Sequence, residues 1–335
     1  MIYYLGTFLQ HHVPWLSFLG WRVWPEVGSL DLGAIDLMDF RVPQRGTTIT
    51  VEELFANVPA RRKFLKAEMT EARKVADEVI SQAMAAARQF VIDHEIATIP
   101  AGEEIRIEPT PEFMRPIIPY AAYSSPGFLE PVQEGVFIVT PVDEGADAEA
   151  AERKLRGHPL ADIPVTALHE AYPGHHLQLV VANQTSTLPR KFGSWLSSLF
   201  VEGWAFYCEE LMEQLGFIDQ PIQKLARLQA QQWRAARIIL DVSLHTNQMG
   251  VQEAIDFLVE RASLEPDDAK AEVRRYTMSP TQPQCYLMGK LQILELVAEY
   301  KRRFPQAGLR QMHDAILNSG SLPPRLMRLK LFGEA

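Results

Sequence analysis

The stretch HEAYPGHHLQ, residues 169–178, places three histidines and one glutamate within eight residues, a combination that could bind a metal ion and activate water. The familiar zinc-protease signature, His-Glu-x-x-His, sets two histidines about 6 Å apart along a helix axis, so that both imidazoles reach one ion. In this chain the fifth position is Pro173, which cannot bind metal. The stretch is therefore a disrupted zinc motif, a different zinc motif, or a polar helix end without chemistry.

A straight helix through this stretch would not bring two histidines to one ion. His169 and His175 would lie about 240° apart around the axis, and His169 and His176 roughly 10.5 Å apart along it. The helix is not expected to be straight, because Pro173 has no amide hydrogen for the carbonyl of His169 and its ring crowds that carbonyl. Gly174 can adopt conformations that other residues avoid. The sequence therefore predicts a bulge or kink that absorbs the Pro-Gly pair as an insertion.

With that distortion the stretch becomes a lengthened His-Glu-x-x-His motif. His169 and His175 are then the predicted zinc ligands, with His176 as the alternative to His175. Glu170 keeps its place beside the first ligand and is the predicted base that activates a water molecule. Catalytic zinc normally has three protein ligands and one open position, so the motif predicts one ion per chain and a third ligand elsewhere.

The best candidate for the third ligand lies in LFVEGWAFYCEELMEQLG, residues 199–216. Glu202 stands on an apolar, aromatic helix face, where a carboxylate is not buried without a partner, and a cation would be that partner. Glu209 follows two turns later and nearly in line with Glu202. It is expected either to support a ligating histidine or to begin an exposed face together with Glu210.

Two further residues are candidates for stabilising a developing oxyanion. Arg237, Asp241 and His245 follow one another at steps of four residues, which places them on one helix face. His245 on this stripe could face the site, although a salt-bridged exposed face explains the same spacing. Tyr286 could donate its hydroxyl to the oxyanion, and a core tyrosine is the alternative interpretation.

The remaining pattern predicts a mainly helical protein with a small strand element ahead of the histidine motif. Residues 71–94 have apolar positions at helical spacing and strong helix formers. Short strands are predicted around 105–107 and 137–140 from alternation and β-branched residues. From Asp162 onward only helices are predicted, the first beginning next to Pro164 and the others lying near 193–215, 221–247, 251–263, 267–277, 284–303, 306–318 and 322–331.

The N-terminal part of the chain differs in character. Residues 45–66, RGTTITVEELFANVPARRKFLK, closely resemble a segment of the mismatch-repair ATPases of the MutL type, without the parts that would bind ATP in that family. We therefore interpret residues 1–70 as a segment of uncertain origin, such as a fusion, and residues 71–335 as a helical domain like those of zinc hydrolases.

Composition excludes several classes of protein. The chain has 335 residues and a formal net charge of -9, which argues against a general nucleic-acid binder. Its 2 cysteines rule out a disulfide framework and a cysteine-rich zinc finger, so a metal must be held by His, Asp or Glu. No apolar run is long enough to span a bilayer, and the first residues lack the features of a signal peptide. These features predict a cytoplasmic protein, and nothing in them indicates an oligomeric state.

HEAYPGHHLQ followed by VEGWAFYCEEL resembles the bacterial proteins grouped as domain of unknown function 885. The resemblance extends to PYAAYSSPGF (119–128), RAARIILDVSLHTNQMGVQEAIDFL (234–258), EVRRYTMSPTQPQCYLMGKLQI (272–293) and MHDAILNSGSLPPRLM (312–327), and covers about residues 70–335. That family resembles gluzincin peptidases with largely helical folds. The resemblance implies zinc held by His169, His175 and Glu202, with Glu170 as the catalytic base.

The sequence thus favours a zinc-dependent hydrolase of amide bonds, with peptides as the expected substrates. Two alternatives stay open. The chain could be a non-catalytic helical module that keeps the metal as a structural element, in which case His176 or Glu209 would be a fourth ligand. It could also be an amidase that acts on a small molecule. A His-His-Glu set suits manganese or iron as well as zinc.

Overall fold

The computed structural model describes residues 69–116, 118, 120–142, 159–192 and 198–333, with side chains described from residue 78 onward. Its contacts divide the chain into a unit of Met1–Ala56 and a unit of Asn57–Ala335. All the described residues belong to the second unit. The interpretation of residues 1–70 as a separate segment falls almost entirely outside the described residues.

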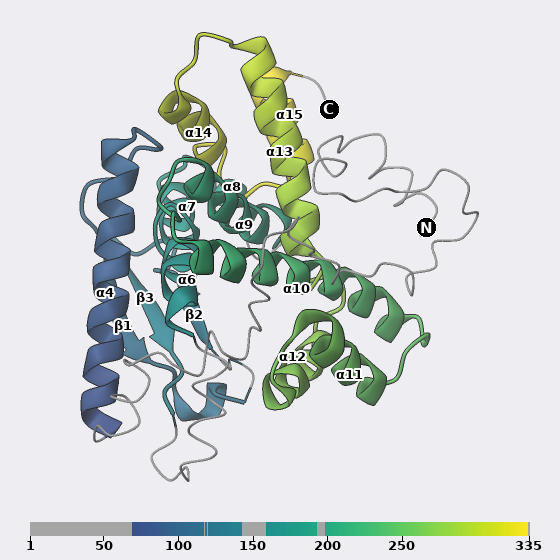
Figure 1. Cartoon of the computed structure of the whole chain (residues 1–335). Coiled ribbons are helices and arrows are strands. Elements are labelled where there is room, and N and C mark those ends of the chain that lie inside the picture. The colour runs from purple at the N-terminus through teal and green to yellow at the C-terminus, as the bar shows by residue number, and fades with distance from the viewer. Residues whose placement is uncertain (1–68, 117, 119, 143–158, 193–197, 334–335) are drawn as a thin grey trace, which may run out of the picture. The chain divides into compact units, whose positions relative to one another are not determined.

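A long helix and a small sheet form one side of this unit (Figure 1). Helix α4 spans Met69–Asp93, which confirms the amphipathic helix predicted at 71–94. Strands β1 (Glu103–Pro109), β2 (Ala121–Ser124) and β3 (Gln133–Val139) form a sheet in the order β1-β3-β2. Strand β1 runs parallel to β3, whereas β2 runs antiparallel to it.

The rest of the described chain is helical, as predicted. Prolines lie in the first turns of α6, α10, α12 and α15, where the missing amide hydrogen has no cost. The elements are α6 (Ile163–Glu170), α7 (His175–Asn183), α8 (Leu188–Phe192), α9 (Ser198–Gln214), α10 (Pro221–His245), α11 (Val251–Ala262), α12 (Pro266–Met278), α13 (Cys285–Arg303), α14 (Leu309–Leu317) and α15 (Pro324–Phe332), with 3-10 turns at Glu112–Met114 and Leu160–Asp162.

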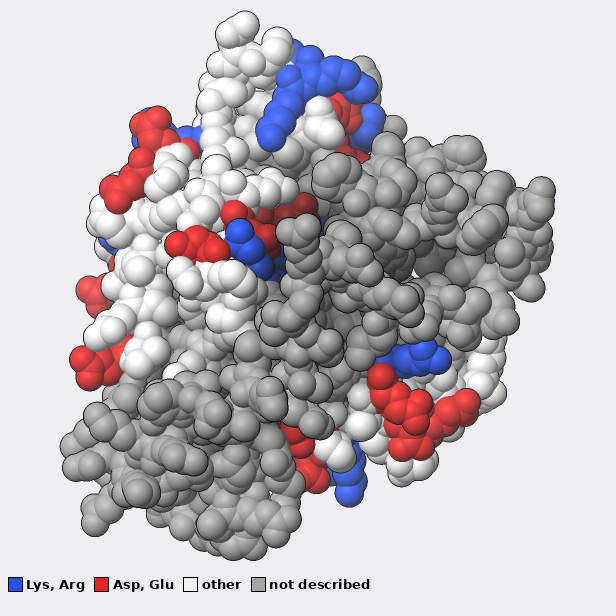
Figure 2. Space-filling view, viewed as in Figure 1, with Lys and Arg blue, Asp and Glu red and all other residues white. Residues whose placement is uncertain are grey.

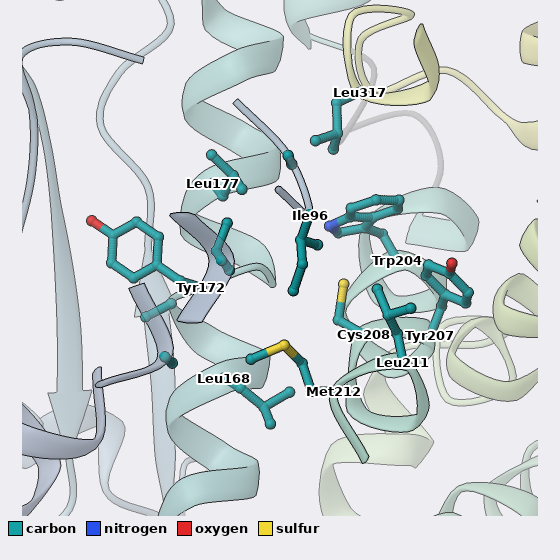
Figure 3. Close-up of a cluster of buried hydrophobic side chains, with 14 of the residues drawn as sticks. Ile96, Leu168, Tyr172, Leu177, Trp204, Tyr207, Cys208, Leu211, Met212 and Leu317 are labelled. Atoms are coloured by element: carbon teal, nitrogen blue, oxygen red, sulfur yellow. The ribbon is translucent and has the colours of Figure 1, made fainter. Parts of the chain in front are cut away.

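The main hydrophobic core surrounds α9 and joins it to α6, α7 and the C-terminal helices (Figure 3). Trp204 of α9 is fully buried, and its indole nitrogen donates to the carbonyl of Pro173 at 2.8 Å. Cys208, one turn further along α9, also approaches that carbonyl, at 3.7 Å. The core therefore holds the loop of the histidine motif in place by polar as well as apolar contacts.

A second, smaller core lies where α10 packs against α11 and α12. It is built from Leu240, Leu258, Val273 and Tyr276, all fully buried, with smaller residues around them. Helix α10 also packs against α6, α9 and α13, and it runs between the two cores (Figure 1). Its polar residues are therefore carried into the interior of the unit.

Two glycines let α9 and α13 approach closely. A Cβ atom on Gly203 would lie 2.4 Å from the carbonyl carbon of Gly289, and one on Gly289 would lie 1.9 Å from the carbonyl oxygen of Leu199. Only glycine fits at either place, because no real Cβ contact is that short. The close crossing sets the distance between Glu202, next to the first glycine, and Tyr286, one turn before the second.

The surface of the described part is charged but mixed in sign. Figure 2 shows acidic and basic side chains interspersed over the described residues of one face. None of the described helices combines the length and the apolar character needed to cross a membrane.

Buried His313 is expected to make the fold sensitive to mild acid. Its Nδ1 donates to the carbonyl of Ile96 at 2.8 Å, its Nε2 lies 2.9 Å from the Tyr207 hydroxyl, and burial lowers its pKa to about 4. The unfolded chain binds the proton near its ordinary pKa of 6.5, so stability present above that pH is lost as the pH falls toward 4. We expect a loss of about 2–3 kcal/mol between pH 7.5 and 4.5 from this group.

Urea unfolding at the two pH values, for the wild type and for His313→Gln, measures this contribution. The variant has no group to titrate at this position, so its free energy of unfolding should fall less than that of the wild type over the same interval. Equal pH slopes for both proteins would contradict the prediction.

Candidate metal centre

The chain breaks between α6 and α7 at the Pro-Gly pair. The sequence predicted a bulge or kink inside one helix, but the structure has two separate helices joined through Ala171–Gly174, with a cis peptide bond between Tyr172 and Pro173. The amide of Gly174 donates to the carbonyl of Leu168 at 3.0 Å. His169 therefore lies in the last turn of α6, and His175 is the first residue of α7.

This break brings the three predicted ligands together. His169, His175 and Glu202 each offer one ligand atom, and these atoms all lie within 4.8 Å of one another. Nε2 of His175 is 3.4 Å from Oε2 of Glu202. The centres of the His169 and His175 rings are 4.7 Å apart. Helices α6, α7 and α9 thus each contribute one residue to the cluster.

The donor set fits a divalent cation such as zinc. Two ligands of a tetrahedral zinc site, each about 2.0–2.1 Å from the ion, lie about 3.3 Å apart, close to the His175–Glu202 separation of 3.4 Å. Oε2 of Glu202, the oxygen that faces Nε2 of His175, is buried and makes no hydrogen bond among the described residues. Such an atom is costly to bury alone, which favours a cation as its partner.

Without a metal, the same groups form a coupled ion pair. Burial opposes ionisation of Glu202, but the close contact and charge of His175, with further help from His169 and Arg237, lower the pKa of Glu202 to about 2. Burial likewise opposes protonation of His175, and Glu202 outweighs it and raises the pKa of that imidazole. The cluster is therefore arranged to keep a carboxylate charged inside the protein.

Glu209 orients His169. This carboxylate is fully buried and accepts a hydrogen bond from Nδ1 of His169 at 2.7 Å, which leaves Nε2 of the imidazole available to a metal. Arg234 of α10 lies 3.6 Å from the same oxygen and balances its charge. Of the two roles predicted for Glu209, the structure shows contact with the ligand and not an exposed face.

Weakening this contact should weaken metal binding. Changing Glu209→Gln keeps an acceptor for His169 but removes the negative charge that makes the imidazole a stronger ligand, so we expect zinc affinity to fall about 10- to 100-fold. Competition with a chromogenic chelator measures the affinity. Glu213→Gln is a matched control on the same helix, because Glu213 pairs with Arg227 away from the cluster. Equal losses in both variants would argue against an orienting role.

Both ring nitrogens of His176, the alternative ligand, are hydrogen-bonded to residues of the sheet. Its Nε2 lies 2.6 Å from Oε2 of Glu103 on β1, and its Nδ1 lies 2.8 Å from the Tyr123 hydroxyl on β2. Tyr172 also donates to Glu103, and Arg88 of α4 pairs with it at 3.1 Å. The second histidine of the pair therefore anchors the motif to the sheet, whereas the first faces the cluster.

Glu170 lies beside the cluster and is partly buried. Burial raises its pKa and the charge of Glu202 raises it further, although His175 and His169 act in the opposite direction. A carboxylate with a raised pKa in contact with a reacting water can take up a proton and return it. The predicted role as a base is consistent with this position.

The two residues predicted to stabilise an oxyanion lie in different surroundings. The hydroxyl of Tyr286 is 3.5 Å from Nε2 of Gln282, and the same nitrogen donates to Glu202 at 3.1 Å, so Tyr286 borders the cluster. His245 contacts the carboxylate and carbonyl of Asp241, at 3.1 and 2.8 Å, at the end of α10. The described contacts therefore connect Tyr286, but not His245, to Glu202.

Several residues around the cluster were not among the site residues predicted from the sequence. Glu103 and Tyr123 come from the sheet, and Gln282 from the loop before α13, each more than forty residues from the histidine motif. A glutamate at a strand start and a glutamine in a loop are ordinary surface residues by pattern alone. Only the packing of the sheet against α7, and of α13 against α9, gives them their contacts.

The fold and the cluster together define a helical protein with a buried His-His-Glu site next to a small mixed sheet. Residues 36–331 match the family model described as bacterial protein of unknown function, DUF885. The chain belongs to this family, as the sequence motifs predicted. The family match begins at residue 36, whereas the resemblance noted in the sequence begins at about residue 70.

Two solved structures share the fold. A candidate lipoprotein of unknown function from Shewanella oneidensis is 29% identical, with a TM-score of 0.64 over 76% of this chain and 46% of that chain. A candidate lipoprotein from Colwellia psychrerythraea is 24% identical, with a TM-score of 0.67 over 80% of this chain and 45% of that one, a likeness that concerns the fold alone. The chain thus spans somewhat less than half the length of the solved structures it matches.

Mismatch-repair proteins match a short part of the chain, in agreement with the MutL-type resemblance noted for residues 45–66. MutL of Chlorobium phaeobacteroides is 60% identical over 42 residues, which is 12% of this chain and 7% of that protein. MutL of Myxococcus xanthus is 38% identical over 96 residues, 28% of this chain and 15% of that protein. The likeness is confined to a small fraction of either protein.

The predicted cytoplasmic location is contradicted by the structural neighbours. Both are named as candidate lipoproteins, a class of exported, lipid-anchored proteins. The prediction rested on the composition of the first residues. Because the chain spans less than half the length of its structural neighbours, those residues are no guide to a leader or an anchor.

Proposed function

We propose that this protein is a zinc-dependent hydrolase that cleaves amide bonds in peptides. The observation that carries the proposal is the convergence of His169, His175 and Glu202 within 4.8 Å, with Glu170 adjacent in sequence to the first ligand. Three protein ligands with a neighbouring base are the composition of a hydrolytic zinc site. The buried, unpartnered oxygen of Glu202 supports a cation at this place.

The chain's own residues have distinct tasks in this proposal. A zinc ion, when bound, supplies Lewis-acid chemistry and makes a water molecule more acidic. Glu170 accepts a proton from the attacking water and later delivers it to the leaving amine, which its raised pKa favours. Tyr286, whose pKa burial raises and whose hydroxyl therefore stays protonated, donates a hydrogen bond to the oxyanion. Glu209 holds His169 in the orientation that a ligand needs.

The arrangement favours a catalytic over a purely structural metal. Structural zinc sites have four protein ligands, and the sequence offered His176 or Glu209 as the fourth. His176 is bound to Glu103 at 2.6 Å, and Glu209 to the far nitrogen of His169 at 2.7 Å. Among the described residues the metal-binding group comprises three members, so a bound zinc ion would have a coordination position free for water.

Metal removal tests the proposal. We expect purified protein to contain about one zinc per chain and to cleave members of a peptide mixture, and we expect a chelator to abolish the cleavage and added zinc to restore it. His175→Ala and Glu202→Ala should lose both zinc and cleavage. His94→Ala, which changes an exposed histidine just after the end of α4, is the matched control and should lose neither.

Three outcomes distinguish the candidate functions. Zinc without cleavage of peptides or of small amides would favour a non-catalytic module with a structural metal. Cleavage restricted to small amides would favour an amidase. Protein without zinc, and without affinity for it, would refute the site itself.

A further inference from the structure

A buried cluster of arginine and tyrosine side chains borders the metal centre on the side of α10 and α12. Nη2 of Arg237 and Nη2 of Arg275 both bind Glu272, at 3.1 and 2.9 Å. Nε of Arg237 donates to the Tyr276 hydroxyl at 2.9 Å. Two guanidinium groups thus share one carboxylate, and the cluster keeps one positive charge that Glu272 does not balance.

Arg237 has a donor group without an acceptor. Its side chain is 5% exposed, and Nη1 is buried and has no hydrogen-bond partner among the described residues. A guanidinium cannot lose its proton, so a buried Nη1 without an acceptor is costly. An anionic group from outside the chain would supply both the missing acceptor and the negative charge that balances the second guanidinium.

The guanidinium of Arg237 is held in a fixed plane. It lies over the rings of Trp233 and Tyr286, at 4.2 and 4.4 Å from their centres. Stacking of this kind fixes the direction of the donors before a ligand arrives, which lowers the entropic cost of binding. Planar, fixed guanidinium donors match a carboxylate better than a mobile ammonium does.

The cluster is one side chain away from the predicted metal ligands. Nη1 of Arg275 donates to Gln282 at 3.0 Å, and Gln282 donates to Glu202 at 3.1 Å. Tyr286, which stacks on Arg237, is the residue proposed to stabilise the oxyanion. Extended peptide covers about 3.5 Å per residue, so one or two residues beyond the cleaved bond would place the terminal carboxylate about 3.5 to 7 Å further along.

We infer that Arg237, assisted by Arg275, binds the free α-carboxylate of the substrate, so that the protein removes residues from the carboxyl ends of peptides. This inference rests on the proposed function, because it uses the same centre and names the substrate class. Arg275 is 21% exposed whereas Arg237 is 5% exposed, which makes Arg275 the outer and Arg237 the inner contact for the carboxylate.

The test compares N-acetyl-tetraalanine with a free carboxyl end and the same peptide as its carboxamide. Zinc-loaded wild-type protein should cleave the acid at least about 10-fold more efficiently in kcat/KM than the amide, since a charge-assisted hydrogen bond is lost in the amide. Arg237→Met should raise KM for the acid by roughly 10- to 100-fold and bring the acid-to-amide ratio near one. Arg227→Met, a buried arginine on the same helix that pairs with Glu213, should keep the wild-type ratio.

The ratio is measured within one protein sample, so partial misfolding of a variant does not change it. If Arg237→Met does not fold, the wild-type ratio alone decides. Equal cleavage of acid and amide by the wild type would overturn the carboxylate site and leave the proposed hydrolase standing.

Equilibrium binding of the two peptides to zinc-loaded Glu170→Gln separates the remaining cases. Tighter binding of the acid than of the amide, with no cleavage of either by the wild type, would support the carboxylate site and overturn the proposed function. No preference in binding and no cleavage would overturn both.

Discussion

Changing Glu170→Gln is expected to remove peptide cleavage and to leave zinc binding intact. Glutamine has nearly the same shape but cannot take up a proton at neutral pH, so the step that generates the nucleophile loses its base. Positioned bases contribute about 10²- to 10⁴-fold to rate, and we expect a loss of that size in kcat. Elemental analysis should still find about one zinc per chain, because Glu170 is not among the three clustered ligands.

The neighbouring carboxylate provides the contrast. Glu202→Gln should lose zinc affinity as well as cleavage, because this side chain belongs to the group of ligand atoms within 4.8 Å. The two variants therefore separate a base from a ligand. If Glu170→Gln cleaved peptides at the wild-type rate, the assignment of the base would be wrong even if the metal site were correct.

Changing Gly174→Ala is expected to disrupt the metal centre by displacing the backbone that carries its two histidines. An added Cβ would lie 1.8 Å from the carbonyl oxygen of His169 and 2.5 Å from that of Leu168, both of them backbone atoms. An ordinary contact needs about 3.4 Å or more, so the loop between α6 and α7 must move by more than 1 Å. Such a shift separates His169 from His175, and we expect zinc affinity to fall at least about 100-fold, beyond the usual loss from a supporting residue.

The same variant should be less stable by about 1–3 kcal/mol, the usual cost of extra atoms in a packed interior. Gly308→Ala is the matched control, since a Cβ there meets nothing within 4 Å and its φ of -69° suits any residue. Chelator competition measures zinc affinity, and urea unfolding measures stability. Wild-type zinc affinity in Gly174→Ala would mean that the ligands do not depend on this loop.

The histidine motif shows how local physics limits sequence-based prediction. Pro173 and Gly174 indicate a distortion because of what their backbones lack, and that much is readable from the sequence. The same two residues are compatible with a bulge, a kink or a complete break. The structure has a break, and its shape depends on Trp204, whose indole nitrogen binds the carbonyl of Pro173 from another helix at 2.8 Å.

The sequence by itself determined the helices and the chemical character of the centre. Amphipathic spacing placed α4 and the helices from α9 to α15, and prolines marked the first turns of α10, α12 and α15. Both are effects of neighbouring residues along one chain. The ligand types follow in the same way, since a carboxylate on an apolar helix face needs a partner wherever it lies. The sequence alone therefore predicted the three metal ligands together: His169, His175 and Glu202.

The tertiary structure alone decided which polar groups serve the centre and which only surround it. His176 turns to Glu103 and not to the cluster because the sheet packs against α7, and Glu209 reaches His169 because α9 crosses α6. The unpaired nitrogen of Arg237 likewise depends on how α10 lies between two cores. Such contacts join residues far apart in sequence, and no periodicity or spacing along the chain encodes the direction in which a buried side chain finds its partner.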